Sequence, residues 1–269
     1  MTQDDRTAAA HAAAQTPIRR IVAGTDLMAE SRFVIPRALS IAEASGASLV
    51  VAHVLDEPGD ETTDYAAMAR KQLARAVEAE RPGDVQPDQE VRAGVPGAVL
   101  EQLADDHDAD LLVLGYHQDR AFEQERFGST MQHVLTHTER DVLLVRQDGR
   151  QPYRSVLVAW DGEKSLAAVL ARARVHAGDA QITVFRNVGL ASEVDAARSA
   201  LEAAPGSDNT LVTSGSLLEN LRDVIRERRT DLLLVPTRGN QGGDLSYLSS
   251  EILRHRLCDT LCCHASIGA

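Results

Sequence analysis

Aromatic side chains are scarce in this chain of 269 residues: Phe, Tyr and Trp make up 3% of it, although 43% of its residues are hydrophobic. A core of this composition must be built from Val, Leu, Ile and Ala, which is typical of parallel strands covered by helices. Long apolar runs are also lacking, and none approaches the roughly 18 residues that indicate a membrane span. We therefore expect an α/β protein with no membrane partner.

Positive charge is in deficit. The chain has 28 Lys and Arg residues against 40 Asp and Glu residues, which gives a net charge of −12. A surface of that sign repels a phosphate backbone, so nucleic acid is not expected as a partner.

Cysteine is limited to Cys258, Cys262 and Cys263, close together near the end of the sequence. An odd, clustered count does not make a disulfide framework, and a reducing cytoplasm is the expected location. Residues 1–17 carry Asp4 and Asp5 and have no leucine-rich core, which argues against a secretory signal. We expect a flexible N-terminal tail there.

Short apolar strands alternate with helices that carry one apolar face, a pattern that predicts a parallel sheet covered on both sides. In the first half, strands are predicted at residues 20–26, 48–54, 91–94, 110–114 and 141–146. Helices are predicted at residues 31–45, 65–81, 129–138 and from Pro96 onward.

The same order then repeats. The strand 155–161 matches 20–26 and again ends in Asp, 230–235 matches 109–114, and 258–263 matches 140–145. The sequence therefore predicts two tandem α/β domains, at residues 18–149 and 150–269, with the second shortened. Each has a five-stranded parallel sheet.

Common catalytic and nucleotide-binding signatures are missing: the chain has no P-loop, no GxGxxG, no GxSxG and no HExxH. It has instead the spacing G-2x-Q-9x-G-S at Gly115, Gln118 and Gly128-Ser129, where a strand end leads through a loop to a helix start. A strand end that faces a helix N-terminus through glycine and hydroxyl residues can bind an anion.

This spacing resembles that of the universal stress protein family, together with a first strand that ends in Asp26 and the segment GVPGAVLEQLADDHDADLLVLG. The resemblance covers the whole chain as two tandem copies and is stronger in the first. It implies an α/β sandwich whose last strands pair, here as an internal pseudo-dimer. Two chains can also associate as a homodimer through a symmetric surface.

In nucleotide-binding members of that family the motif is G-2x-G-9x-G-[ST]. The resemblance therefore implies that the first domain binds ATP or AMP, with Mg²⁺ accompanying ATP. Asp26 would contact the adenosine end, and Gly115, Gly128, Ser129 and Thr130 would line the phosphates. The alternative for Gly128-Ser129-Thr130 is a helix start that needs no ligand.

Gln118 stands where the family has its second glycine. If that glycine has φ > 0 or lies against a phosphate, glutamine costs about 1 kcal/mol or more, or fills the site. His117, Arg120 and Arg126 nearby could supply compensating charge, although Glu123 and Glu125 oppose them. Two functions stay open: a nucleotide-binding stress-response regulator, and an interaction or scaffold protein of the same family without nucleotide.

The second copy departs further from the motif. Pro236 stands at the Gly115 position, and either Ser249-Ser250 or, after a deletion, Ser246-Tyr247 stands where Gly128-Ser129 would be. We interpret this domain as mainly structural.

Two groups of residues, one of His and Cys and one of His alone, are candidate metal sites. His255, Cys258, Cys262, Cys263 and His264 cannot all face one ion from a strand, so buried cysteines are the preferred interpretation and no metal is expected. His133 and His137 share a helix face but have no third ligand nearby, and surface histidines are expected. No general base can be nominated either, so at most a weak ATPase or autophosphorylation activity is expected.

Overall fold

The computed structural model describes residues 17–56, 64–80, 83–116, 128–147, 149–162, 165–202, 207–237 and 247–263. The chain divides into two compact units, one from Ile18 to Pro152 and the other from Tyr153 onward. We call them the first and second domain. Gln118 and its charged neighbours in the same loop lie outside the described residues.

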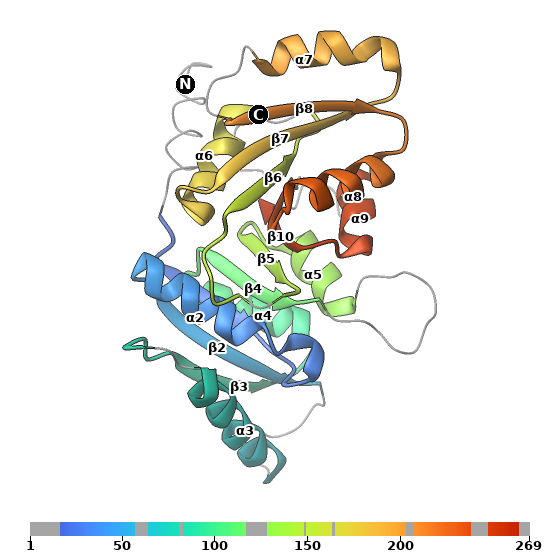
Figure 1. Cartoon of the computed structure of the whole chain (residues 1–269). Coiled ribbons are helices and arrows are strands. Elements are labelled where there is room, and N and C mark those ends of the chain that lie inside the picture. Colours follow the sequence, from blue (N-terminus) through green and yellow to red (C-terminus); the bar gives the residue numbers. More distant parts are fainter. Residues whose placement is uncertain are drawn as a thin grey trace, which may run out of the picture. The chain divides into compact units, whose positions relative to one another are not determined.

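The first domain is a parallel sheet in the order β3-β2-β1-β4-β5 (Figure 1). Its strands are β1 (Arg20–Gly24), β2 (Ser48–Leu55), β3 (Asp88–Ala93), β4 (Leu111–Gly115) and β5 (Asp141–Val145). Its helices are the 3-10 turn η1 (Ala29–Ser31), α2 (Val34–Ser45), α3 (Asp64–Glu80), α4 (Pro96–Asp106) and α5 (Ser129–His137).

The second domain repeats this order as β8-β7-β6-β9-β10, again with every described pair parallel. Its strands are β6 (Ser155–Ala159), β7 (Gln181–Val188), β8 (Asn209–Ser214), β9 (Leu232–Pro236) and β10 (Asp259–Cys263). Its helices are α6 (Leu166–Ala177), η2 (Ala191–Glu193), α7 (Val194–Glu202), α8 (Leu217–Arg228) and α9 (Tyr247–His255). Both domains have the predicted α/β fold.

In both domains, an aspartate at the corresponding position accepts hydrogen bonds from the start of the first strand. Asp110, just before β4, accepts hydrogen bonds from the backbone N–H groups of Arg19 and Arg20 at 2.8 and 2.9 Å. Asp231, just before β9, accepts the equivalent two bonds at the start of β6, at 2.8 and 3.0 Å. A central strand start needs these acceptors because its first amides lie outside the ladder. The repeat seen in the sequence is therefore a repeat of hydrogen bonding.

Several predicted boundaries were wrong. The helix predicted at residues 31–45 begins only at Val34, because Ser31 ends the η1 turn and its hydroxyl is bonded to Asp26. Strand β3 begins at Asp88 and not at residue 91. The predicted strand was too short because the first two residues of β3 are exposed and polar. Edge strands expose such residues, and hydrophobic patterning does not detect them.

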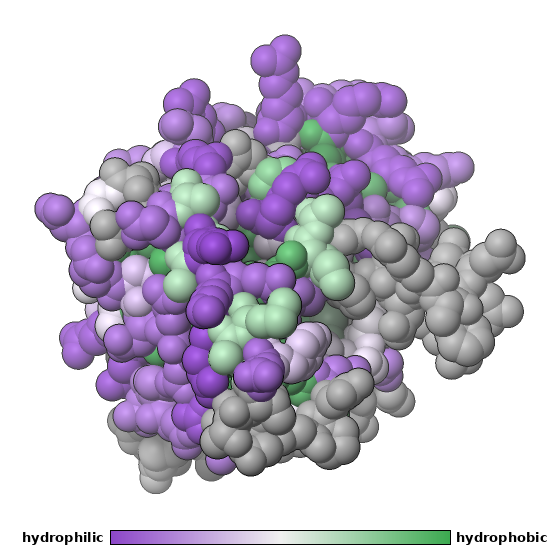
Figure 2. Space-filling model, turned by 90° about the horizontal axis from the view of Figure 1, so that it is seen from below, coloured by the Kyte–Doolittle hydropathy of each residue, from purple (hydrophilic) through white to green (hydrophobic). Residues whose placement is uncertain are grey.

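Hydrophobic side chains are few on the surface of the described residues. The exposed large ones are Met28, Tyr65, Met68, Val95 and Leu190. Figure 2 shows one face of the molecule, largely hydrophilic, with hydrophobic side chains in small separate groups. None of the helices in the described ranges has the length and hydrophobicity needed to cross a bilayer.

A charged cluster connects the edge strand β3 to the end of α4, and it predicts a pH dependence of stability. Glu90 lies 2.6 Å from His107 Nε2 and 2.6 Å from the Arg92 guanidinium. Burial raises the pKa of Glu90, but hydrogen bonds and charge from Arg92 and His107 outweigh it, so the net pKa lies below 4.5. The ionised carboxylate therefore adds stability above pH 4.5 that is lost as the pH falls through its lowered pKa.

We accordingly expect Glu90→Gln to lower the free energy of unfolding at pH 7. The difference from the parent should shrink as the pH falls below 4.5, where the carboxylate of the unfolded parent takes up a proton, and should continue to shrink until the pH passes the lowered pKa of the folded protein. Urea unfolding at pH 7, 5 and 4 measures it. A difference that stays constant over this range would show that the carboxylate charge has no part in it.

Candidate functional site

The site lies where the strand order of the first domain reverses. The chain leaves β1 toward β2 on one side, while β4 pairs with β1 on the other, so the carboxyl ends of β1 and β4 diverge into different connections. Crevices at such points are where ligands bind in open α/β sheets. A cavity of about 310 Å³ opens here, at the lower end of the usual range for small-ligand sites.

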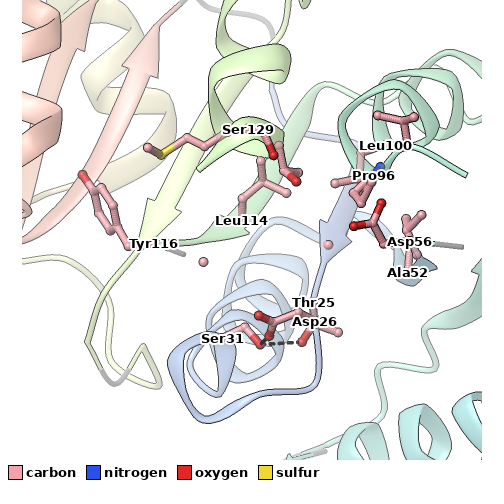
Figure 3. A pocket seen from close by; sticks show the side chains of 16 residues that line it. Thr25, Asp26, Ser31, Ala52, Asp56, Pro96, Leu100, Leu114, Tyr116 and Ser129 are labelled. Carbon is pink, nitrogen blue, oxygen red and sulfur yellow. Dashed lines mark hydrogen bonds between the residues drawn. The ribbon is translucent and has the colours of Figure 1, made fainter. Parts of the chain in front are cut away.

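Residues from both strand ends and both neighbouring helices line the cavity (Figure 3). Thr25, Asp26 and Ser31 lie on one side, from the segment that follows β1. Ser129, Thr130 and Met131 come from the start of α5. The walls between are largely apolar: Ala52, Val54, Val95, Pro96, Leu100 and Leu114.

The segment after β1 is a tight turn closed by side chains. Asp26 accepts a hydrogen bond from the backbone N–H of Met28 at 2.9 Å and one from the Ser31 hydroxyl. The Thr25 and Ser31 hydroxyls lie 2.9 Å apart, and Thr25 Oγ1 accepts from the Leu27 N–H at 3.1 Å. One Asp26 carboxylate oxygen is thereby held in a fixed place at the edge of the cavity.

The opposite end of the cavity is the first turn of α5. Gly128 is the residue before the helix and supplies no capping side chain, and the first intrahelical bond runs from Gln132 N–H to the Gly128 carbonyl at 3.0 Å. The amides of Ser129 and Thr130 therefore precede the helical ladder. Ser129 is exposed and Thr130 half-buried, so both can face a ligand. This end can donate hydrogen bonds to an anion.

Four of the six residues proposed from sequence lie together. Asp26, Gly115, Ser129 and Thr130 all line the cavity. Gly128 stands beside it as the residue before α5, with φ of −56°, a conformation open to any residue. Gln118 lies outside the described residues. The contacts of these residues with a nucleotide stay predictions.

The lining also includes residues that were not predicted, among them Ser31, Asp56, Val95 and Tyr116. A signal was available for Asp56, because it follows β2 as Asp26 follows β1, and parallel strands bring such ends to one edge. Nothing comparable marked Ser31, whose place depends on a turn with φ of +60° at Leu27.

In the second domain, a phenylalanine stands at the strand position that matches Ala52. Gly24 pairs with Ala52 in the first domain, and Ala159 pairs with Phe185 in the second. Phe185 is 1% exposed and belongs to a core cluster with residues of α8 and α9, the counterparts of α4 and α5. A buried phenyl ring therefore lies at the strand position where Ala52 lines the cavity of the first copy.

Other changes accompany that ring. Trp160 replaces Thr25 and carries the Arg186 guanidinium 5.2 Å from its ring centroid. Pro236 ends β9 where Gly115 ends β4. Helix α9 begins at Tyr247, as α5 begins at Ser129, so the alignment on Ser249-Ser250 was wrong and the shorter alignment on the final helix holds.

The cysteines are buried as predicted, at 2% exposure or less. Among the residues that the structure describes, no three His, Cys, Asp or Glu side chains gather to hold a metal, and His264 lies outside them. His137 is exposed, and His133 is partly exposed, with 31% of its side chain accessible. His133 is half-buried against Gly97, 3.3 Å from Glu101, because the missing side chain of Gly97 lets α4 and α5 approach closely.

Comparison with known proteins agrees with the fold and with the resemblance seen in the motif. Residues 17–146 match the model of the universal stress protein family. Among proteins of curated function, none matches the chain.

Solved structures extend the likeness to both domains. A universal stress protein from Archaeoglobus fulgidus is similar with a TM-score of 0.71 and 16% identity, over 91% of this chain and 98% of that one. A putative universal stress protein from Pseudomonas aeruginosa gives 0.66 and 16%, over 93% and 94%. A universal stress protein in complex with cAMP is 29% identical over 49% of this chain and 98% of its own, with a TM-score of 0.39.

The first domain therefore belongs to the universal stress protein family, and a second domain of the same fold follows it in tandem.

Proposed function

We propose that the first domain binds an adenine nucleotide, AMP or ATP, and that this protein is a nucleotide-responsive regulator of a stress response. The observation that carries the proposal is the two-ended cavity, with a fixed carboxylate at Asp26, uncapped amides at the start of α5, and apolar walls between. A purine would lie between the apolar walls. The carboxylate would accept a hydrogen bond from the nucleoside, and the α5 amides would bind phosphate.

The charge of the described part of the cavity favours a ligand with few phosphates. Asp26 and Asp56 are both acidic, and no Lys or Arg is among the described residues that line it. Phosphate charge would be met by amides and by the Ser129 and Thr130 hydroxyls alone in this part of the site. ATP would therefore need Mg²⁺, which reduces its charge, more than AMP would.

Nucleotide occupancy would act through the segment between Gly115 and Gly128. Both ends of that segment adjoin the cavity, Gly115 in its lining and Gly128 at the start of α5. A phosphate held between these two ends would change the surface that partners contact, and residues 117–127 lie outside the described residues. No catalytic residue is assigned.

Released nucleotide tests the proposal. Protein purified without added nucleotide is denatured, and the supernatant is analysed by chromatography. Adenosine, AMP and ATP, with and without Mg²⁺, are then titrated into the protein by calorimetry. We expect AMP binding, and ATP binding that is stronger with Mg²⁺. Protein that releases no adenine nucleotide and gives no heat with any of the three does not have this function.

A second function is favoured by Gln118 and by the acidic lining of the cavity: an interaction or scaffold protein that holds no nucleotide. Gln118→Gly restores the family motif and separates the two. If the variant binds AMP and the parent does not, the natural protein belongs to this second class. Equal binding by both shows that glutamine is compatible with the nucleotide.

A further inference from the structure

The turn after β1 is organised by one buried hydroxyl. Ser31 is 6% exposed and its Oγ contacts Thr25 Oγ1, the Met28 carbonyl at 3.2 Å and the Asp26 carboxylate. A hydroxyl has one proton, and the carboxylate is its strongest acceptor here. Thr25 then donates to Ser31 and Ser31 donates to Asp26, so a chain of hydrogen bonds fixes the carboxylate.

This turn is a conformation that needs support. Leu27, between Asp26 and Met28, has φ of +60°, which a residue with a β-carbon seldom adopts. This backbone conformation is strained, and neighbouring contacts must offset the strain. The bonds from Leu27 N–H to Thr25 and from Met28 N–H to Asp26 are two such contacts.

Gly115 provides the surface on which the turn rests. A β-carbon at Gly115 would lie 3.2 Å from both Cα and Cβ of Ser31 and 3.3 Å from Val34 Cγ2. The Cα of Ser31 is backbone and cannot swing aside as the tip of a long side chain could. A side chain at position 115 would therefore require Ser31 to shift by a few tenths of an ångström, which would weaken its hydrogen bond to Asp26.

We infer that Gly115 and Ser31 are positioning residues for the nucleoside end of the site. Gly115 has no side chain and so leaves room for Ser31, and the Ser31 hydroxyl orients the Asp26 carboxylate. The inference rests on the proposed nucleotide function and changes the role that the family resemblance implied for Gly115, which was to line the phosphates. The second copy agrees with this coupling, because it has Pro236 in place of Gly115 and Trp160 in place of Thr25.

Adenosine and AMP distinguish the two roles, because adenosine has no phosphate. Gly115→Ala and Ser31→Ala should weaken both ligands by the same factor, about tenfold for the loss of one hydrogen bond to a charged group. Their AMP-to-adenosine affinity ratio should equal that of the parent. Thr130→Ala is the matched control at the α5 end, and it should weaken AMP and leave adenosine unchanged.

The outcomes separate the inference from the proposed function. If Gly115→Ala weakens AMP and spares adenosine, Gly115 serves the phosphates and the inference is overturned. If the parent binds neither ligand, the proposed function fails, and amide hydrogen exchange still tests the coupling. Exchange at Leu27 and Met28 should rise about tenfold in both Gly115→Ala and Ser31→Ala, and unchanged exchange would refute it without any ligand.

Discussion

Ala52→Phe is expected to abolish adenosine and AMP binding by the first domain, with a loss in affinity of more than about a hundredfold. Ala52 lies in the apolar wall of the cavity, directly across the β1–β2 pair from Gly24. A phenyl ring there would enter the volume that the purine is proposed to occupy. Calorimetric titration of the parent and the variant measures the effect.

The second domain provides the reason to expect that this variant folds. Phe185 occupies the equivalent position, paired with Ala159 in the same register, and is completely packed. The ring in the first domain would meet an existing cavity and not a filled core, so overpacking strain should be small. Ala52→Val, which adds less volume, gives a graded step and should weaken binding less.

The matched control is Ala74→Phe, which adds the same ring at an exposed position of α3. It should bind AMP as the parent does. A well-folded Ala52→Phe protein, judged by circular dichroism and thermal unfolding, that still binds AMP with parental affinity would place the nucleotide elsewhere and would contradict the proposed site.

The reciprocal change, Phe185→Ala, is expected to destabilise the second domain by about 3–5 kcal/mol. The ring is 1% exposed and packs with Leu221 and Val224 of α8 and Ile252 of α9. Its removal loses hydrophobic burial and leaves a cavity between the sheet and two helices. Urea unfolding, followed by hydrogen exchange in β6 and β7, measures the loss and locates it.

Phe33→Ala is the control for this variant, since Phe33 is only half-buried and lies before α2. It should lower the free energy of unfolding clearly less than Phe185→Ala does. Removing the ring should not create a nucleotide site in the second domain, because Trp160 and Pro236 leave it without the Thr25 hydroxyl and the Gly115 surface. A Phe185→Ala protein with stability near that of the parent would show that this ring is not part of a tightly packed core.

Local sequence patterns were sufficient to predict the α/β architecture of both domains. Runs such as Leu111–Gly115 and Leu232–Pro236 are hydrophobic at nearly every position because central parallel strands are covered on both faces. The helices between these strands have one apolar face each, and this alternation of strands and helices predicts a parallel sheet. Polar edge strands were the exception, since a residue such as Asp88 pairs through its backbone while its side chain stays in water.

Part of the candidate site could be predicted from the sequence. Asp26, Gly115, Ser129 and Thr130 follow strand ends or begin a helix, and a parallel fold brings such positions to one edge. The sequence also marked the second copy as degenerate by its missing glycines.

What only the tertiary structure decided is which side chains share space across long stretches of chain. Ala52 and Phe185 occupy matching strand positions, yet whether a cavity or a ring results depends on how each packs against helices far along the sequence. Gly115 and Ser31 are likewise distant in sequence, and only their contact shows why a glycine is needed. Periodicity records which face of an element is buried, whereas packing between elements depends on the three-dimensional meeting of particular side chains.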